Sequence, residues 1–577
     1  MKRKMILGLL FAVILPAVLL FSACENPADN GDTPPPRTVR SVLGPAVTFF
    51  KLEGETDVKN VKLTWRMRSR ADRYEVFRDG VCVGSTKGDT LDDYGLTAGG
   101  TYTYQIKAYE GNELEAQSAA TEVTLPASLG SPSQTWDNSI SNGNGLNTGG
   151  LSGNVFLIGG TYYRYSVSES GSGTGRTVTV SEATSTDGSS WDTPTVLETL
   201  SDSKLEGSAF RRVGDNVVLT GHHENGSDYT LGNFYLATIK PGQNSFTESF
   251  RGRPYNNESR DQSVFIDNDG SAYVISATPT DIGIYKLNAD WTGFAENIGL
   301  FFRGERRETP YVMRIGEQYY FFSSMQSGWY PSQAKYATGT SINNWGVLNE
   351  LGNRALFGTQ YNYVAAYGPD GKKMYGLYGW RWANQYHHTE PEGNYPRLMI
   401  LAFNGAFAGA SYFAKVEYYQ NYGLIGVQPG KKITQGATVS ASSADAIYNN
   451  LSLINDGADM ESSGYFRGGS VPYSLYIDLH TAAALKEIHL TTYMVGGSEG
   501  AFKYLLEGST DGENYTTVLD GSGNWQVGFA VGNITVTGAY RYLRFTVNDI
   551  RNVSNGDVSI ASWADGIIEL AIFGGTQ

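Results

Sequence analysis

Three carboxylic acids and one amide recur at equivalent positions of a repeated sequence unit. Each of them comes eight to eleven residues before the glycine of a predicted tight turn. In chain order they are Glu206, Asp261, Glu308 and Gln360. Carboxyl groups that meet in one place can divide acid–base chemistry between them, because a neighbouring negative charge raises the pKa of one acid and keeps its proton on. A protonated acid beside a second group that directs water is what cleavage of a glycosidic bond needs.

The unit that carries these residues occurs five times between residues 135 and 428. Each copy is an apolar alternating strand, a tight turn and an aromatic-rich strand, and the turn glycines are spaced by 54, 56, 46 and 55 residues. They are Gly160, Gly214, Gly270, Gly316 and Gly371. An all-strand repeat of roughly 50 residues is typical of a β-propeller, so we predict five blades.

The innermost strand of a propeller blade lines the central channel, and its start faces an axial pocket. The four polar residues are therefore predicted to converge on one axis, whereas the first copy has Leu151 and Ser152 at this place and no carboxylate. Arg307 should point to the opposite side of its strand and leave Glu308 without an ion pair from its neighbour. The alternative is that the three carboxylates, Glu206, Asp261 and Glu308, are solvated acids at the edges of the blades.

Five short motifs in this segment match one enzyme family, in the same order. They are Ser-Arg-Asp at 259–261, Asp-Asn-Asp-Gly-Ser-Ala-Tyr at 267–273, Arg-Glu-Thr-Pro at 307–310, Ser-Gly-Trp-Tyr-Pro at 327–331 and Gly-Thr-Gln at 358–360. On these motifs the segment resembles glycoside hydrolase family 43, whose members are five-bladed propellers, and within it the exo-β-1,3-galactanase subgroup. The resemblance implies an inverting, exo-acting glycosidase that removes galactan-type side chains.

The same resemblance assigns a role to each polar residue. It implies that Glu308 is the general acid and that Asp261 modulates its pKa. It implies that Glu206 binds substrate, although this residue could also be the base. In the subgroup a glutamine assists water in place of the blade-one aspartate of other members, and this glutamine falls on Gln360.

Other positions depart from the subgroup's pattern and concern the substrate pocket. Residues 146–150 lack its histidine, residues 162–167 lack its glutamate, and Gly-Trp-Arg-Trp at 379–382 stands for Gly-Asp-Arg-Trp. We predict substrate contacts at Trp329, Trp380, Arg381, Trp382 and Arg260, although the tryptophans could equally pack inside the blades. The lost residues favour a rival interpretation, a non-catalytic glycan-binding propeller, and the retained acids oppose it.

The first 24 residues have the pattern of a secretory leader. Lys2, Arg3 and Lys4 precede an apolar run that ends in Ser-Ala before Cys24. This resembles a bacterial lipobox, so we predict a lipid on Cys24, the alternative being an ordinary signal peptide with an incidental cysteine. The polar, proline-containing residues 25–43 would tether the protein to the cell envelope, outside the cytoplasm. Membrane contact is expected through the lipid alone.

Two smaller sandwiches are predicted on either side of the propeller. Residues 44–126 alternate with a period of two, and Leu63-Thr-Trp65, the run 74–80 and Thr101-Tyr102 make them resemble a fibronectin type III domain, an Ig-like sandwich. Tyr102 would be its corner tyrosine, and we expect a spacer without chemistry.

Residues 430–577 alternate in the same way and predict a jelly-roll sandwich. The motifs at 455–457, 476–479, 507–512 and 569–574 make them resemble the discoidin or coagulation-factor type C family, which includes carbohydrate-binding modules. Tyr465, Phe466 and Tyr493 are predicted to present rings to a glycan. The resemblance also implies a structural calcium, with its ligands at Asp456, Asp459 and Glu569, although these could be plain turn residues.

Composition limits the class of protein and of partner. The chain has 577 residues, a formal net charge of −14, 70 glycines, 13% aromatic and 18% charged residues. This predicts an all-β protein and argues against a coiled coil, a disordered chain or a nucleic-acid binder. A neutral partner such as a polysaccharide or a glycoprotein glycan fits better, bound by a monomer. Two cysteines and six histidines without ligand spacing predict no disulfide framework and no cofactor or metal for catalysis.

Overall fold

Strands follow one another throughout the part of the chain that the structure describes. The computed structural model describes residues 39–138, 153–382, 395–460, 464–494, 499–553 and 565–576. The helical elements among them are three single 3₁₀ turns, Gly173–Gly175, Pro254–Asn256 and Leu451–Leu453. The all-β prediction is therefore confirmed. The described residues contain no apolar helix of the length that a membrane crossing needs. Cys24 and the predicted leader lie outside the described residues.

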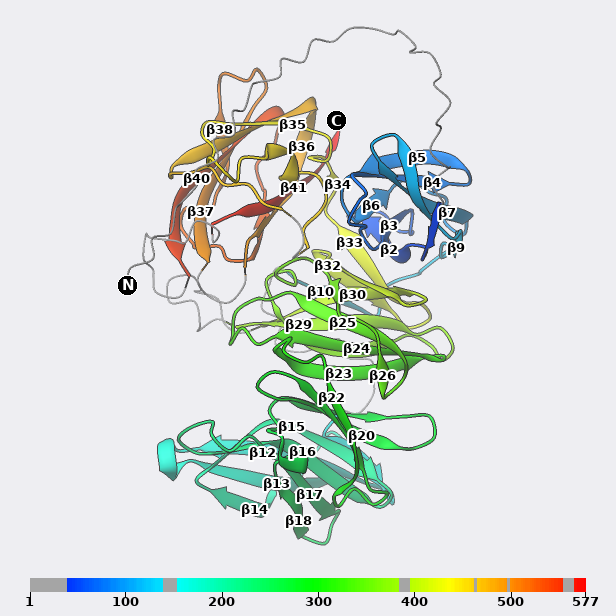
Figure 1. Ribbon diagram of the computed structural model, residues 1–577, viewed down its shortest axis with the longest axis vertical. Coiled ribbons are helices and arrows are strands. Elements are labelled where there is room, and N and C mark those ends of the chain that lie inside the picture. Colours follow the sequence, from blue (N-terminus) through cyan, green and yellow to red (C-terminus); the bar gives the residue numbers. More distant parts are fainter. Residues whose placement is uncertain are drawn as a thin grey trace, which may run out of the picture. The chain divides into compact units, whose positions relative to one another are not determined.

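Five antiparallel sheets form the predicted propeller blades (Figure 1), and each is a meander whose first strand lies at one edge. Blade one is β11 (Val155–Ile158), β12 (Thr161–Ser170), β13 (Thr177–Ser185) and β14 (Thr195–Ser201). Blade two is β15 (Ser203–Val213), β16 (Asn216–Asn225), β17 (Asn233–Lys240) and β18 (Ser245–Gly252). Blade three is β19 (Gln262–Ile266), β20 (Ala272–Ala277), β21 (Ile282–Leu287) and β22 (Phe294–Phe301). Blade four is β23 (Arg307–Ile315), β24 (Gln318–Met325), β25 (Ala334–Ser341), β26 (Asn344–Trp345) and β27 (Asn349–Leu351). Blade five is β28 (Gln360–Tyr367), β29 (Met374–Arg381), β30 (Tyr395–Asn404) and β31 (Phe407–Ser411).

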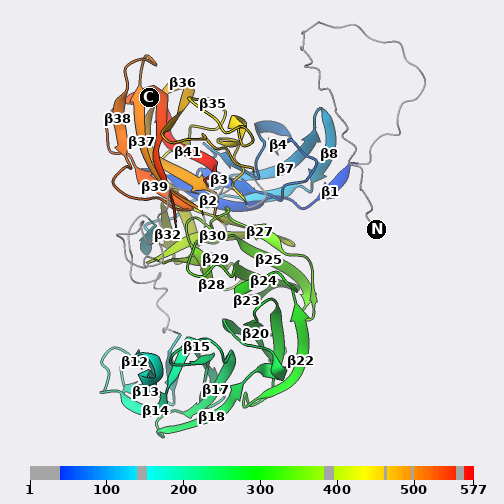
Figure 2. The same cartoon turned by 60° about the vertical axis from the view of Figure 1, so that its left-hand side comes forward.

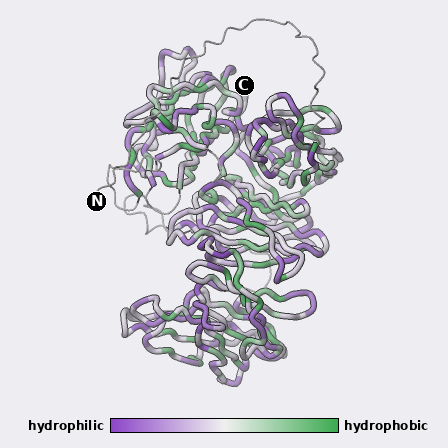
Figure 3. Tube along the Cα trace, in the orientation of Figure 1, coloured by the Kyte–Doolittle hydropathy of each residue, from purple (hydrophilic) through white to green (hydrophobic). Residues whose placement is uncertain are grey.

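The five predicted turn glycines each join the first two strands of a blade. All five have positive φ, between 59° and 86°, which glycine adopts without a steric cost. Buried apolar clusters then join consecutive blades. The pairs Tyr165 with Phe210, Val218 with Val274, Ile275 with Phe321, and Phe322 with Tyr361 represent these four junctions. Hydrophobic and hydrophilic stretches accordingly alternate along the trace (Figure 3).

Two sheets form the N-terminal sandwich. One contains β1 (Arg40–Val42), β8 (Glu113–Ser118), β7 (Thr101–Glu110), β4 (Arg73–Arg78), β5 (Val81–Thr86) and β9 (Thr121–Thr124). The other contains β10 (Gln134–Asp137), β32 (Lys415–Tyr419), β33 (Gly423–Gln428), β2 (Ala46–Leu52), β3 (Asn60–Thr64) and β6 (Thr90–Asp93). The hydroxyl of Tyr102 accepts a hydrogen bond from the backbone N–H of Thr97 at 2.9 Å, as a corner tyrosine does.

Two predicted boundaries differ from the structure. The range 135–428 is wider than the five blades, because β10, β32 and β33 belong to the sandwich and β33 pairs in parallel with β2. Tyr419 and Ile425 are accordingly buried in the sandwich core. The predicted tether, 25–43, also extends too far, since β1 pairs in parallel with β8. Period-two alternation identifies a strand but does not name its partner.

The C-terminal sandwich is built around one long strand. This strand, β36 (Tyr473–Thr492), pairs with β35 (Thr438–Ala441) and β40 (Ala539–Asn552) over its first half. Over its second half it pairs with β39 (Phe529–Asn533) and β41 (Ile567–Thr576). The remaining strands are β34 (Lys431–Lys432), β37 (Gly500–Ser509) and β38 (Thr516–Asp520). Figure 2 shows β37 and β38 side by side at the edge, and the predicted sandwich is confirmed.

Candidate active site

Each of the four predicted polar residues lies at the beginning of the first strand of its blade. Glu206 is the fourth residue of β15, Glu308 is the second residue of β23, and Gln360 is the first residue of β28. Asp261 immediately precedes β19. The register that the turn glycines predict therefore holds in four blades. The equivalent residues of blade one, Leu151 and Ser152, lie outside the described part of the chain.

An irregularity in the strand follows the site residue in three of these blades. The shifts in register lie at 206–209, 308–311 and 361–363. In blades two and four the residue after the glutamate has a left-handed backbone, with φ of 56° at Gly207 and 51° at Thr309. Bulges bend a strand and re-aim its side chains, and they are frequent beside active sites. The local backbone therefore serves the placement of these side chains.

The amide of Gln360 connects the candidate acid to two neighbouring groups. Its Nε2 donates to Oε1 of Glu308 and to the carbonyl oxygen of Gly328, the latter at 2.8 Å. Its Oε1 accepts from Nε1 of Trp382 at 2.9 Å. Because a carbonyl only accepts and an indole N–H only donates, these partners fix which end of the amide faces Glu308. Gln360 thus holds the acid, and its oxygen is engaged by Trp382 instead of facing a water molecule.

Glu308 has the environment of a proton donor. Burial, reinforced by the negative charge of Asp261, raises the pKa of Glu308 to about 8. The positive charges of Arg307 and Arg260 oppose this shift without cancelling it. A carboxyl group with this pKa is protonated at neutral pH, when an ordinary glutamate has lost its proton.

Arg307 points away from Glu308, as the alternation of the strand predicts. Its Nη2 donates to the carbonyl oxygens of Ser323 at 2.9 Å and of Gln333 at 3.0 Å, inside blade four. Its Nε donates to Oγ of Ser323 at 3.0 Å. The guanidinium is therefore used in holding the blade together.

Asp261 is fixed by the residue that follows the acid. Oδ2 of Asp261 accepts from the backbone N–H of Thr309 at 3.1 Å and from Oγ1 of Thr309 at 3.2 Å. The left-handed backbone of Thr309 turns both donors toward blade three. These contacts bring Asp261, Glu308 and Gln360 into one cluster across three blades.

Glu206 lies in blade two, with its side chain 43% exposed. Its Oε1 accepts from the hydroxyl of Tyr229, and its Oε2 lies 3.9 Å from Nδ1 of His222. The carbonyl of the next residue, Gly207, accepts from Nε2 of Gln262 at 3.0 Å. Since Gln262 follows Asp261, this bond ties the two acid-bearing strands together at their starts.

Two of the predicted substrate contacts, Trp380 and Trp382, lie beside Gln360. Trp382 bonds to Gln360, and its ring centroid lies 5.7 Å from that of Trp380, which is the register partner of Gln360. Trp329 is 48% exposed and follows Gly328, so its face is open to a ligand. Arg260 pairs with Glu258 at 3.1 Å and remains partly exposed.

Arg381 differs from its prediction. It is buried, and its Nη1 donates to the carbonyl of Gly358 at 3.2 Å. It therefore supports the segment that leads into Gln360, and its side chain is not presented to a substrate. Alternation along β29 places Trp380 and Arg381 on opposite faces, and only the first shares the face of Gln360.

The predicted glycan-binding aromatic residues of the C-terminal sandwich divide in the same way. Tyr465 stacks on Tyr448 at 4.7 Å and meets Tyr493 at 5.0 Å, and all three line one surface pocket. Phe466 is fully buried and packs in the sandwich core with Tyr473. The prediction for Phe466 is wrong because successive residues of an extended segment point to opposite sides.

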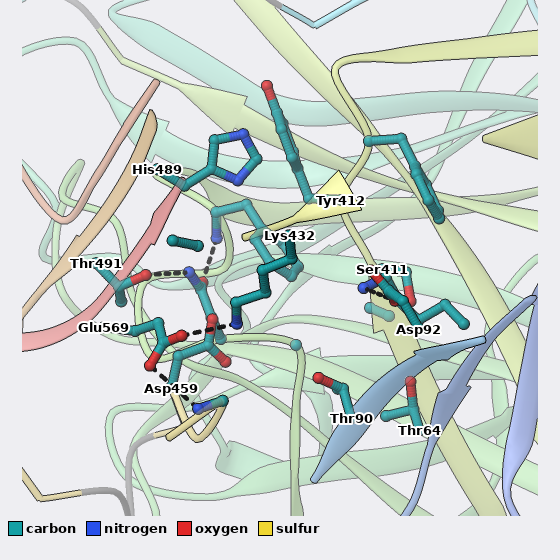
Figure 4. A pocket seen from close by; sticks show the side chains of 18 of the residues that line it. Thr64, Thr90, Asp92, Ser411, Tyr412, Lys432, Asp459, His489, Thr491 and Glu569 are labelled. Carbon is teal, nitrogen blue, oxygen red and sulfur yellow. Dashed lines mark hydrogen bonds and ion pairs between the residues drawn. The ribbon is translucent and has the colours of Figure 1, made fainter. Parts of the chain in front are cut away.

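A lysine takes the place expected for calcium. Nζ of Lys432 lies 2.7 Å from Oε1 of Glu569, beside Asp459, in a cavity of about 100 Å³ (Figure 4). Burial, followed by the charge of Glu569, raises the pKa of Asp456 and of Asp459 to about 7. Within the described ranges, no three His, Cys, Asp or Glu side chains form a group that could hold a metal ion. The metal-ligand prediction for Asp456, Asp459 and Glu569 therefore does not fit this arrangement.

Several supporting residues escape prediction from the sequence. Thr309, Tyr229 and His222 reach the acids only through strand register and bulges, which no spacing rule reveals. The parallel between Glu206-Gly207 and Glu308-Thr309 is the one signal that the sequence offers, because both pairs stand eight residues before a turn glycine.

The chain is similar to known proteins at low levels of identity. No family model matches it. A region of 75 residues is 36% identical to an α-amylase from Niallia circulans, which is 12% of this chain and 6% of that protein, so the chain spans a small part of its length. Among solved structures, an exo-β-1,3-galactanase from Clostridium thermocellum has 18% identity and a TM-score of 0.42, over 72% of this chain and 99% of that one. A Phanerochaete chrysosporium exo-β-1,3-galactanase with β-1,3-galactotriose has 15% identity and a TM-score of 0.45, over 76% of this chain and all of that one.

Proposed function

We propose that this chain is a glycoside hydrolase that removes terminal β-linked galactosyl units from galactan-type glycans, with Glu308 as the general acid. The observation that carries the proposal is the state of Glu308, which burial and Asp261 keep protonated at neutral pH. The substrate class follows from the motif resemblance at 259–261, 307–310 and 358–360. The partner fits the acidic composition, which argues against a polyanion.

The proposed reaction divides between the two faces of the sugar. Glu308 gives its proton to the glycosidic oxygen, the bond between this oxygen and the anomeric carbon breaks, and the electron pair stays on the leaving oxygen. Water attacks the anomeric carbon from the opposite face and releases a proton to the surrounding water, so the configuration inverts, and Glu308 then takes up a proton from solvent. Glu206 accepts a hydrogen bond from a sugar hydroxyl, and Trp329 offers a ring to the sugar.

Gln360 has a defined place in this scheme. Its amide nitrogen fixes Oε1 of Glu308, so Oε2 is left to carry the acidic proton. Directing water with its own oxygen would require release of the indole of Trp382. We therefore assign it to the orientation of the acid.

We also propose that the enzyme is held at the bacterial cell envelope by a lipid on Cys24 and that Tyr465 and Tyr493 contact glycan. The leader pattern and the shared surface pocket of these tyrosines support this. Metabolic labelling with a fatty acid, compared between the wild type and Cys24→Ala, tests the anchor. Equal labelling of both would contradict it.

The test of the proposed function compares Glu308→Gln with the wild type on β-1,3-galactan, arabinan and arabinoxylan. We expect galactose from the first substrate, and a loss on the order of 10²–10⁴-fold in the variant. An activated aryl galactoside needs less protonation and should lose less. Glu317→Gln is the matched control, because Glu317 lies on the same blade with its side chain 94% exposed.

Two outcomes would contradict the proposal. Full activity of Glu308→Gln on the polysaccharide would remove its role as acid. No product from any substrate would favour the rival interpretation, a propeller that binds glycans without cleaving them.

A further inference from the structure

The loop between β16 and β17 of blade two carries Tyr229, which contacts the proposed sugar-binding glutamate. The loop comprises residues 226–232, and the hydroxyl of Tyr229 donates to Oε1 of Glu206. The ammonium of Lys204 lies 3.7 Å from the centroid of the tyrosine ring. Tyr229 is nevertheless 51% exposed, and the side chain of Glu206 is 43% exposed. Because packing covers only half of Tyr229, the position of its hydroxyl depends on how the backbone of the loop is held.

Arg253 binds the backbone that directly follows Tyr229. This arginine comes immediately after β18, the last strand of the blade, and its Nη2 donates to the carbonyl oxygen of Thr230 at 2.9 Å. Its Nε donates to the carbonyl oxygen of Leu231 at 2.7 Å. The N–H donors of a guanidinium lie in one rigid plane, so two bonds from the same group fix the direction of both peptide groups as well as their position.

The same stretch of backbone is also bound from the interior of the blade. The backbone N–H of Leu231 donates to Oε2 of Glu224 and that of Gly232 to Oε1, both at 2.7 Å. The side chain of Glu224 is 2% exposed, so these bonds are shielded from water. The peptide groups after Tyr229 are therefore held on one side by a buried carboxylate and on the other by Arg253.

The segment that begins with Arg253 leads directly to Asp261. Within it the backbone N–H of Ser259 donates to the carbonyl oxygen of Gly232 at 2.8 Å, so the segment binds three consecutive carbonyls of the loop. Oε1 of Glu258 lies 3.4 Å from Nη2 of Arg253 and helps to align the guanidinium. The loop beside the sugar-binding glutamate and the approach to the acid-modulating aspartate are thus joined to each other.

We propose that Arg253 is a positioning residue, which holds the loop so that the hydroxyl of Tyr229 fixes the carboxylate of Glu206 for a hydroxyl group of the terminal sugar. This inference rests on the proposed function for its substrate and deepens it. The bond from Tyr229 occupies Oε1 of Glu206 and leaves Oε2 for the sugar. Without Arg253 the carboxylate would have to be ordered when the sugar binds, and this cost lowers the affinity.

Two arginines of the same blade provide the variant and its control. Arg253→Met keeps the apolar stem of the side chain and removes the donors to Thr230 and Leu231. Arg251→Met is the matched control, because Arg251 lies two residues earlier, on β18, and pairs with Glu248 of its own strand through Nε at 3.1 Å. A purely structural role in blade two would make the two variants alike.

The expected effect is on sugar binding. With β-1,3-galactobiose, Arg253→Met should raise KM by roughly 3–10-fold, as the loss of one hydrogen-bond-strength contact does, with kcat within about 2-fold. Arg251→Met should match the wild type in both parameters. Adding Arg253→Met to Tyr229→Phe should produce no further rise in KM, because the arginine acts through the tyrosine hydroxyl. An additive rise, or an unchanged KM in Arg253→Met, would overturn the inference.

A second measurement, amide hydrogen exchange followed by mass spectrometry, does not depend on catalysis. Peptides that cover residues 226–232 should exchange roughly 3–10-fold faster in Arg253→Met than in the wild type, because local opening of the loop then breaks fewer bonds. In Arg251→Met their exchange should be unchanged. A wild type without activity on galactan would contradict the proposed function alone, and the exchange rates would still decide whether Arg253 holds the loop. Equal exchange of this loop in Arg253→Met and the wild type would overturn the inference.

Discussion

At the scale of single residues, Thr309 links the candidate acid to its neighbouring carboxylate. A β-branched residue with φ of 51° is strained, and such strain persists where surrounding contacts impose it. Here the contacts are the two hydrogen bonds that Thr309 gives to Asp261 and the contact of its hydroxyl with Oγ of Ser324 at 3.2 Å. The strain therefore serves to aim both donors at Asp261.

Loss of the Thr309 hydroxyl should lower kcat without unfolding blade four, because Asp261 then loses one of the two hydrogen bonds that Thr309 donates to it. Thr309→Val keeps the shape and the backbone donor but loses Oγ1, so kcat should fall by roughly 10-fold, the equivalent of one hydrogen bond to a charged group. Thr309→Ser keeps both donors and should stay within about 2-fold of the wild type. Steady-state kinetics on β-1,3-galactan measures both. A serine variant as impaired as the valine variant would contradict this explanation.

The sequence predicts these residues to different extents. Spacing from a turn glycine predicts Glu206, Asp261, Glu308 and Gln360, because a repeat preserves the register between the turn and the start of the strand. It does not predict the hydrogen bonds of Thr309 to Asp261 or the position of His222 opposite Glu206, because these depend on a bulge and on a cross-strand partner. It also places Arg381 and Phe466 wrongly, since the side of a strand that a residue faces is decided by packing beneath it.

At the scale of elements, the close approach of β29 to the start of its neighbouring strand β28 keeps Gln360 in place. Gly379 on β29 has no room for a side chain, because a Cβ there would lie 1.9 Å from Oγ1 and 2.6 Å from Cβ of Thr359. Thr359 is fully buried, donates to the carbonyl of Leu356 at 2.7 Å, and directly precedes Gln360. The absence of a side chain at Gly379 therefore lets Thr359 pack closely against β29, and this packing positions Gln360 next to Glu308.

Gly379→Ala should consequently displace Gln360 from the acid. We expect a loss of stability of about 1–3 kcal/mol from overpacking and a fall in kcat of roughly 10-fold or more, as a displaced catalytic geometry causes. Gly371→Ala in the same blade is the control, because its φ of 77° is unfavourable for alanine but no atom lies within 4 Å of the added Cβ. That variant should lose stability alone, as thermal unfolding and kinetics will show. Equal losses of kcat in both variants would contradict the proposed packing role.

Alternation of apolar and polar residues in the sequence does not predict which strands pair with one another. The strands β32 and β33 alternate like those of the blades, yet they complete the N-terminal sandwich through the parallel pairing of β33 with β2. The partner of β33 comes from more than 350 residues away in the chain, as the register of Phe50 with Gly426 shows, and β32 pairs with the distant strand β10. Such pairing depends on the shape of the assembled blades, which short motifs do not encode.

At the scale of the whole molecule, residues 39–577 form one compact unit. Charged residues from its N-terminal and C-terminal sandwiches line one common cavity. The cavity of Figure 4 is lined by β3 and β6 of the N-terminal sandwich, by β31 of blade five and by the C-terminal sandwich. Within it Asp89 is buried, and burial together with the charge of Asp459 raises its pKa well above the usual value. Lys432 supplies positive charge against these carboxyl groups, because its Nζ pairs with Glu569.

Removal of Lys432 should therefore destabilise the fold through uncompensated charge. Lys432→Met should lower the free energy of unfolding by about 3–5 kcal/mol, as the loss of one partner of a buried pair does. The double variant Lys432→Met, Glu569→Leu should recover most of this loss, since both charges are then gone. Denaturant unfolding measures the three proteins. A single variant as stable as the wild type, or a double variant no better than the single one, would contradict this assignment.

The most direct test of the central claim, that Glu308 is an acid kept protonated by burial and Asp261, is the pH dependence of kcat/KM on β-1,3-galactan. An acid must be protonated to donate, so activity should be lost as pH rises through about 8. In Asp261→Asn the charge that helps to raise the pKa of Glu308 is absent, so the alkaline limb should move to lower pH. An alkaline limb at the same pH in both proteins would contradict the account.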